Sequence, residues 1–210
     1  MPRNICCERR VTVDSFRSFP LMSAFFFKSF LRRPLEVASI VPSSKVLVDR
    51  VARRMDFSRP RRIVELGAGE GAHSRELRRR LGHESRLLLF ELNAELARKL
   101  EMQFAGDDRV EVVHGDASSL SDELEKRSWD DCDYVLSGIP FSLLEKEKKR
   151  DLIRTIHDAL APEPHAAFII YQVTPELREH VPMFHREISE YCVRNIPPMF
   201  VKSFHKLPEE

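Results

Sequence analysis

The chain has 210 residues, of which 42% are hydrophobic, and a net charge of +1 at pH 7. This length is enough for one globular domain with helices on both faces of a central sheet, and a charge so near zero argues against a dedicated nucleic-acid binder. The charge is unevenly spread, because residues 1–33 hold seven Lys or Arg against two acids and are therefore +5, which leaves −4 for the rest.

The first 34 residues are expected to form a basic segment ahead of a domain at 35–210. Residues 1–20 are polar and irregular, as is typical of a poorly ordered terminus, and Met22 is a candidate physiological start. Residues 21–33, L-M-S-A-F-F-F-K-S-F-L-R-R, predict a helix with a Phe-rich face and basic residues opposite. Such a helix suits an anionic membrane surface. The alternative is that its Phe side chains pack on the chain's own domain.

A second helix follows Pro34 and the stretch V-P-S-S. A serine cap begins it, and its inner side carries Val46, Leu47, Val51 and Met55. The spacing of these residues predicts a helix that packs one face on the sheet.

The stretch I-V-E-L-G-A-G-E-G-A-H, from Ile63 to His73, predicts a buried strand and a tight turn into a helix. Its glycines, Gly67, Gly69 and Gly71, permit positive φ and close approach of the backbone to a ligand. The next strand, 86–91, ends in an acid about 20 residues past the last glycine, where such folds place the carboxylate that binds a ribose. This order of elements predicts a site for a nucleoside-type cofactor.

A third strand, at 110–114, also ends beside an acid. The helix before it begins at Asn93, a favourable N-cap residue, and runs to Phe104. After the strand, the Asp116 carboxylate can accept a hydrogen bond from an adenine amino group, while the N–H of Ala117 meets a ring nitrogen. The alternative is that Asp116 only caps a turn.

Four more strands are predicted at 133–137, 166–171, 187–193 and 199–204. The helix between the first two has a capping box of Ser142 and Glu145 and ends near Leu160. The stretch N-I-P-P separates the last two strands, which are expected to form a closing pair with one antiparallel member. The alternation predicts an α/β fold with a doubly wound, seven-stranded, mostly parallel sheet and one antiparallel strand.

The glycine pattern is E-x-G-x-G-x-G, led by Glu65, and differs from the G-x-G-x-x-G of dinucleotide folds. An acid beside the loop would repel a pyrophosphate but suits a ligand with an ammonium group and a sulfonium. The stretch V-E-L-G-A-G-E-G resembles motif I of the class I S-adenosylmethionine-dependent methyltransferases. The resemblance implies a Rossmann-like methyltransferase fold, S-adenosylmethionine as cofactor, and a cofactor site made of Glu65, Gly67, Ala68, Gly69, Gly71, Glu91, Leu92, Asp116, Ala117 and Ser137.

Motif IV, where these enzymes choose substrates, corresponds to S-G-I-P-F at 137–141. It is similar to the N-L-P-Y/F of the ribosomal-RNA adenine dimethyltransferases, but Ser137 or Gly138 replaces the side chain that orients the adenine. Those enzymes also carry a helical RNA-binding domain after the sheet, whereas this sequence stops at Glu210. Together with F-L-R-R-P-L-E-V-A-S-I-V-P-S-S and N-I-P-P, the motif resembles the bacterial phospholipid N-methyltransferases, over roughly 25–204.

This resemblance implies a peripheral enzyme on the inner, cytoplasmic face of the membrane that methylates the amine of phosphatidylethanolamine or a partly methylated form. The sulfonium already activates the methyl group, so no strong base is required, and the acceptor-site candidates are Tyr171, Phe141 and Ser137. The rings of Tyr171 and Phe141 could line the site of the methylated ammonium, or they could be core residues. The alternatives are an rRNA adenine or small-molecule methyltransferase, and a protein that binds the cofactor without catalysis.

Metal chemistry and disulfides are not expected. Four cysteines make neither a zinc spacing nor a disulfide framework, which favours a reducing compartment. The eight histidines include no pair at zinc spacing on a predicted helix, and the serines form no G-x-S-x-G elbow. The expected partners are therefore a lipid substrate and an anionic membrane, with no metal and no nucleic acid, and the oligomeric state is left open.

Overall fold

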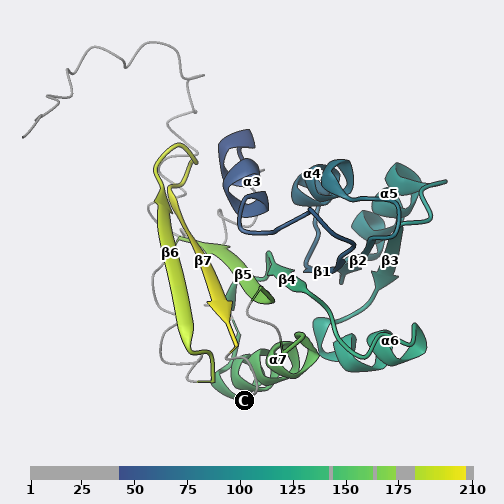
Figure 1. Cartoon of the computed structure of the whole chain (residues 1–210). Helices are drawn as coiled ribbons and strands as arrows, with labels where there is room; N and C mark the ends of the chain where they lie inside the picture. The colour runs from purple at the N-terminus through teal and green to yellow at the C-terminus, as the bar shows by residue number, and fades with distance from the viewer. Residues whose placement is uncertain (1–42, 142–143, 163–164, 174–182, 207–210) are drawn as a thin grey trace, which may run out of the picture.

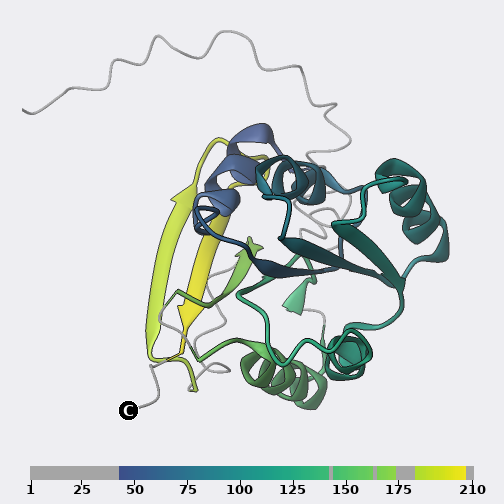
Figure 2. The same ribbon diagram turned by 45° about the vertical axis from the view of Figure 1, so that its right-hand side comes forward.

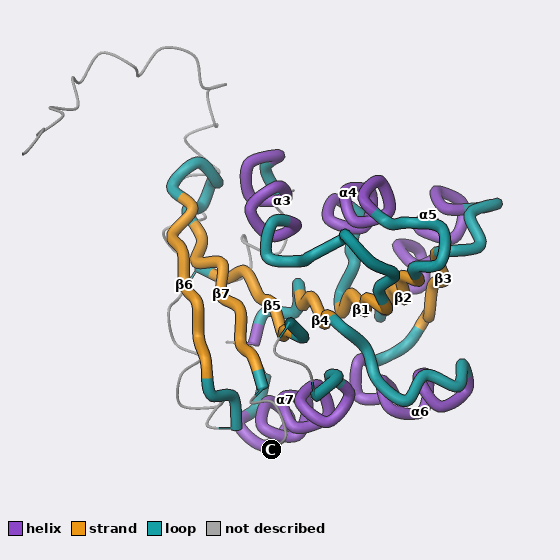
Figure 3. The backbone as a smooth tube through the Cα atoms, in the orientation of Figure 1, coloured by secondary structure: helices purple, strands orange, loops and turns teal. Residues whose placement is uncertain are grey.

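The computed structural model of the chain describes residues 43–141, 144–162, 165–173 and 183–206. In these ranges a central sheet lies between two layers of helices (Figure 1 and Figure 3). The predicted basic segment at 1–34 and its helix at 21–33 lie outside the described residues.

Seven strands of the described residues form one sheet in the order β3-β2-β1-β4-β5-β7-β6. β7 runs antiparallel to both of its neighbours, and every other neighbouring pair is parallel. The predicted sheet, mostly parallel with one antiparallel strand, is therefore confirmed. The strands are β1 Arg62–Leu66, β2 Arg86–Glu91, β3 Val110–His114, β4 Tyr134–Ser137, β5 Ala167–Gln172, β6 Arg186–Cys192 and β7 Met199–His205.

The strand order reverses between β1 and β4 at the centre of the sheet. From β1 the chain moves outward through β2 and β3, and it then returns to the other side of β1 with β4. Leu66 pairs with Ser137, so both strands end at the same level. Ligands of doubly wound sheets bind outside the carboxyl ends of the strands at such a reversal.

The helices cover both faces of the sheet (Figure 1, and Figure 2 after a 45° turn). Leu47, Leu77 and Leu100 of α3, α4 and α5 pack into one core, and Leu124 and Ile153 of α6 and α7 pack into the core on the other face. The helices are α3 Lys45–Ala52, α4 Ala72–Arg80, α5 Ala94–Phe104, α6 Leu120–Lys126 and α7 Lys146–Ala159, with a short 3-10 turn, η2 Ala117–Ser119.

Two of the predicted helix caps are confirmed and one is wrong. The side chains of Ser44 and Asn93 accept N–H groups from the first turns of α3 and α5. α7 begins at Lys146, so Glu145 occupies the N-cap position and makes no capping hydrogen bond with its side chain. The predicted capping box needs Glu145 inside the first turn, and its other member, Ser142, lies outside the described residues.

Arg61 is a fully buried cation at the amino-terminal edge of the sheet, opposite the reversal point. Its guanidinium donates to Asp133 at 2.7 Å, to the Asp56 carboxylate at 2.5 Å and to the Asp56 carbonyl at 2.7 Å. Because the carboxylates of Asp56 and Asp133 both bind the Arg61 guanidinium, this ion-pair cluster holds the start of β1 against the start of β4.

The variant Arg61→Met is expected to lower the free energy of unfolding by about 3 kcal/mol, because it leaves the Asp133 carboxylate without its buried partner. Urea denaturation measures this loss. Arg62→Met is a matched control, because Arg62 is exposed and its ion pair with Asp131 is long, at 3.9 Å. Its free energy of unfolding should fall by less than about 1 kcal/mol. Equal stability of the two variants would contradict the assignment.

Candidate functional site

The loop between β1 and α4 turns tightly through three glycines with positive φ. Gly67, Gly69 and Gly71 have φ of +74°, +57° and +74°. A β-carbon at Gly67 would also lie 3.3 Å from Ile139 Cγ1. The missing side chains therefore let the segment after β4 approach the loop, as expected for a loop that a ligand approaches closely.

The end of β2 holds this loop in place. The N–H of Ala68 donates to the Phe90 carbonyl at 3.0 Å. The buried Glu91 carboxylate accepts the N–H of Gly69 at 2.7 Å with one oxygen and the N–H of Asn93 at 2.9 Å with the other. Each oxygen keeps a further lone pair, so Glu91 can accept from both hydroxyls of a ribose while it holds the loop.

A cavity of about 540 Å³ lies beside the loop, between the carboxyl ends of the central strands and α7. Its volume is within the range typical of small-molecule sites. Five of the predicted cofactor residues line it, namely Gly67, Glu91, Leu92, Asp116 and Ala117. The structure thus brings together residues from the ends of three strands.

Asp116 caps a turn and also lines the cavity. Its carboxylate accepts the N–H of Ser118 at 2.8 Å and so caps η2, and it also lines the cavity. The hydrogen bonds from Ser118 hold the pKa of Asp116 below its usual range, so it is an ionised acceptor. Leu92 and Ile139 add apolar surface to the same cavity. This set fits an adenine, which needs an acceptor for its amino group and apolar contacts for its faces.

Glu65 is a buried carboxyl at the other end of the loop. Its Oε2 accepts the hydroxyl of Ser74 at 2.7 Å. Burial raises the pKa of Glu65 to about 8, the nearby Glu91 carboxylate adds to the rise, and Ser74 opposes it. A cationic ligand would favour the ionised form of Glu65, so this residue fits the ammonium end of the expected cofactor.

Tyr171, at the end of β5, stacks on His73 of α4 with ring centroids 4.4 Å apart. His73 Nε2 lies 3.1 Å from Ser43 Oγ, and its Nδ1 is buried with no hydrogen-bond partner among the described residues. Burial lowers the pKa of His73 to about 3, so the ring is neutral at physiological pH. Burial and the nearby Glu65 raise the pKa of Tyr171 well above its usual value. These side chains therefore form a neutral polar cluster.

Gly138 is the point where the ends of β1, β4 and β5 converge. A β-carbon at Gly138 would lie 2.6 Å from the Tyr171 hydroxyl and 2.8 Å from the Gly67 carbonyl oxygen. The buried Ser137 accepts the N–H of Ile139 at 3.2 Å and shapes this turn. The turn therefore places Tyr171 next to the glycine loop.

The variant Gly138→Ala is expected to lower the free energy of unfolding by about 1–3 kcal/mol, because the Tyr171 ring and the Gly67 carbonyl must both move. Adding Tyr171→Phe removes one of the two contacts and should restore part of the loss. Gly82→Ala is the control, because a β-carbon at Gly82 would lie 3.9 Å from its nearest neighbour, Ser85 Oγ. If thermal denaturation shows the same loss of stability in Gly138→Ala as in Gly82→Ala, Gly138 is not closely packed against Tyr171.

Phe141 lies away from this cluster. Its ring is buried and packs edge to face on Phe168, with centroids 5.8 Å apart. It belongs to the core that α7 covers. Phe141 is therefore a core residue, which was the alternative to its predicted place beside the methylated ammonium.

Two groups of site residues were not found from the sequence. Lys148, Asp151 and Thr155 of α7 line the cavity, and their i, i+3, i+7 spacing places them on one helical face, which was an available signal. His73 carried no pattern beyond its place in the first turn after the glycine loop.

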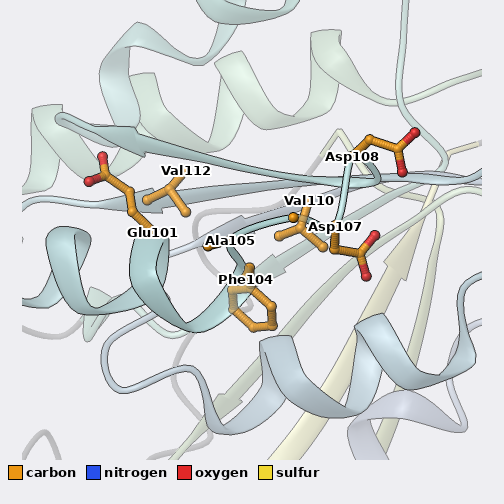
Figure 4. Close-up of a pocket in the computed structure, with 8 residues that line it drawn as sticks. Glu101, Phe104, Ala105, Asp107, Asp108, Val110 and Val112 are labelled. Atoms are coloured by element: carbon orange, nitrogen blue, oxygen red, sulfur yellow. The ribbon is translucent and has the colours of Figure 1, made fainter.

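A separate hollow of about 370 Å³ lies beside the end of α5 and the start of β3 (Figure 4). Asp107, one of its lining residues, bridges Arg78 and Arg109. Because Val110 begins β3, this hollow is at the opposite edge of the sheet from the glycine loop, and none of the predicted site residues line it. Within the described ranges, no group of three His, Cys, Asp or Glu residues could hold a metal ion.

Residues 63–163 match a family described as a methyltransferase domain. Over 173 residues the chain is 31% identical to the ornithine lipid N-methyltransferase of Singulisphaera acidiphila, covering 82% of this chain and 90% of that protein. It is 43% identical over 74 residues to the ribosomal RNA small subunit methyltransferase H of Bordetella petrii, covering 35% of this chain and 20% of that protein. The crystal structure of precorrin-6y C5,15-methyltransferase from Geobacter metallireducens shares the fold, with a TM-score of 0.58 and 15% identity over 78% of this chain and 89% of that one. The chain therefore belongs to the class I S-adenosylmethionine-dependent methyltransferases, as an N-methyltransferase whose cofactor is S-adenosylmethionine.

Proposed function

We propose that this enzyme methylates the amine of a membrane lipid headgroup, such as phosphatidylethanolamine, one of its partly methylated forms, or an ornithine lipid. The observation that carries the proposal is the extent of the match to the ornithine lipid N-methyltransferase, which covers 82% of the chain. A match of that length includes both the glycine loop and Tyr171, and so the acceptor side of the fold. The match to the ribosomal RNA enzyme covers only 35%.

The charges around the cavity beside the glycine loop do not suit the binding of a nucleic acid. Glu91, Asp116 and Asp151 line it, and Lys148 is the one cation among the described residues that do so. A nucleic acid needs several Lys or Arg to neutralise its phosphates.

Neutral surroundings at the acceptor end suit the chemistry of an amine. S-adenosylmethionine, when bound, supplies a methyl group that its sulfonium already activates. An alkylammonium has a pKa of about 10, so presenting it neutral at pH 7 costs about 4 kcal/mol. Desolvation beside Tyr171 and the neutral His73 lowers this cost. We place Tyr171 and Ser137 at the acceptor, and Glu91, Asp116 and Glu65 at the ribose, the adenine and the ammonium of the cofactor.

Action at the inner, cytoplasmic surface of the membrane is part of the proposal. Its support is the Phe-rich stretch at 21–33, which lies within a segment, residues 1–33, that contains seven basic and two acidic residues. Among the described residues, no helix has the length and apolar character needed to cross a bilayer.

The test is a methyl-transfer assay with radiolabelled S-adenosylmethionine and purified full-length protein. Vesicles of phosphatidylethanolamine, vesicles of ornithine lipid, ribosomal RNA and small soluble amines are offered in separate reactions. Label is expected in one of the amine lipids, and phosphatidylcholine vesicles, whose nitrogen is fully methylated, are the control. Label in RNA or in small amines only, or no label in any acceptor despite cofactor binding, would contradict the proposal.

A further inference from the structure

The turn between β6 and β7, which we call the hairpin tip (residues 193–198), exposes an apolar surface. Val193 is 63% exposed and Ile196 is 43% exposed, and Tyr191, at the end of β6, is 48% exposed. These are three of the five large exposed hydrophobic side chains among the described residues; the others are Leu92 and Met102. Such clustering marks an interaction surface more often than single exposed residues do.

The hairpin tip lies at the same edge of the sheet as the acceptor site. β7 is antiparallel to β5, and Phe200 near its start pairs with Gln172 at the end of β5. The turn that precedes β7 therefore projects beyond the carboxyl end of β5, where Tyr171 lies. Figure 1 shows this turn next to α3.

Asn195 fixes the hairpin tip to the start of α3. Its side chain is buried, accepts the N–H of Ser44 at 2.9 Å and donates to the carbonyl of Pro197 at 2.8 Å. The tip is therefore held in place against Ser44, which caps α3.

The charges near the tip are positive. Arg194 and Lys45 are exposed, and neither forms an ion pair with the described residues. The nearby acid Glu190 is neutralised by ion pairs to Arg50 and Arg54. An apolar tip flanked by the exposed cations Arg194 and Lys45 complements a bilayer with anionic headgroups.

We propose that the hairpin tip inserts Val193 and Ile196 into an anionic bilayer and so turns the acceptor edge of the sheet toward the lipid. This inference rests on the proposed function for its purpose, but the contact itself requires only a membrane. A lipid could then present its amine near Tyr171 without leaving the bilayer.

The binding test uses full-length protein and vesicles of phosphatidylcholine with phosphatidylglycerol. The double variant Val193→Ser/Ile196→Ser is expected to bind at least tenfold more weakly than wild type in cosedimentation. Met102→Ser removes an apolar side chain of α5 that is more exposed than Val193 or Ile196, and this variant should bind as wild type does. Unchanged binding by the double variant would overturn the proposal, as would an equal loss in the Met102→Ser control.

A second readout is independent of total affinity. The variant Ile196→Trp should show a blue shift of its fluorescence on addition of the vesicles and quenching by brominated lipid, whereas Met102→Trp should show neither. Light scattering without vesicles tests a rival occupant: if Val193→Ser/Ile196→Ser turns a dimer into a monomer and vesicle binding is unchanged, the surface joins two copies of the chain and the proposal is overturned.

Activity separates this inference from the proposed function. The double variant should lose methyl transfer to lipid in vesicles at least tenfold and keep it on a short-chain phosphatidylethanolamine that stays monomeric in solution. Equal loss on both substrates would overturn the docking role. If wild type methylates neither lipid, the proposed function fails, and the vesicle-binding experiments still decide the contact.

Discussion

The variant Glu91→Ala is expected to bind S-adenosylmethionine roughly ten- to a hundredfold more weakly than wild type, at about 1.4 kcal/mol per tenfold. The carboxylate holds the glycine loop through the N–H of Gly69 and keeps lone pairs for the ribose hydroxyls. Without it, these hydroxyls are buried unpaired, at a cost of about 1–3 kcal/mol. Isothermal titration calorimetry with the cofactor and with S-adenosylhomocysteine measures the loss.

Two controls separate the role of Glu91 in binding from its role in the loop. Glu91→Gln keeps one acceptor oxygen and the side-chain shape, so its loss should be intermediate. Glu101→Ala, which removes a carboxylate beside the hollow of Figure 4, should leave the affinity unchanged. Wild-type affinity in Glu91→Ala would refute the ribose assignment, and a melting curve of each variant shows whether the fold is intact.

The strands and the cofactor loop could be predicted because their signals are local. β2 is an apolar run that ends in Glu91, and both β2 and β3 have the predicted bounds. β4 and β5 differ from the predicted bounds by one residue at their ends. Glycine spacing and acids at strand ends indicate the candidate cofactor residues, because parallel strands bring their carboxyl ends to one edge.

The surroundings of Tyr171, where we propose that the acceptor binds, could not be predicted in the same way, because contacts between distant residues determine them. Phe141 and Tyr171 both follow or end a strand, yet Phe141 packs on Phe168 in the core and Tyr171 stacks on His73. The face that each ring takes depends on how the chain turns after the strand. The closeness of Gly138 to Tyr171 sets that turn, and no spacing in the sequence encodes it.

The stability of the ligand-free protein should fall as pH rises from 6.5 to 8 because of Glu65. Burial raises its pKa from 4.5 to about 8, so over this range the folded protein keeps a proton that the unfolded chain has lost. A state that binds more protons loses stability as pH rises, and the loss levels off above the folded pKa. At about 1.36 kcal/mol per unit, the loss is on the order of 2 kcal/mol.

His73 sets the lower limit of that window. Burial lowers its pKa from 6.5 to about 3, so the unfolded chain binds a proton there that the folded protein does not. This contribution raises stability with pH, but the unfolded His73 is only half protonated at pH 6.5, so less than about 0.5 kcal/mol of it remains above that pH. Denaturation at pH 6.5, 7.25 and 8 therefore reports on Glu65, and Glu65→Gln should remove the slope. A slope that survives in this variant would assign the pH dependence to another group.

The affinity for S-adenosylmethionine should rise over the same window, by up to about tenfold per pH unit. The ammonium and sulfonium charges of the ligand favour the ionised form of Glu65, so binding releases the proton that burial retains. S-adenosylhomocysteine lacks the sulfonium charge and should show a weaker dependence. Calorimetry in buffers of different ionisation enthalpy counts the released proton directly. If the wild type releases no proton at pH 7, or Glu65→Gln releases as many, Glu65 does not face the cationic end of the cofactor.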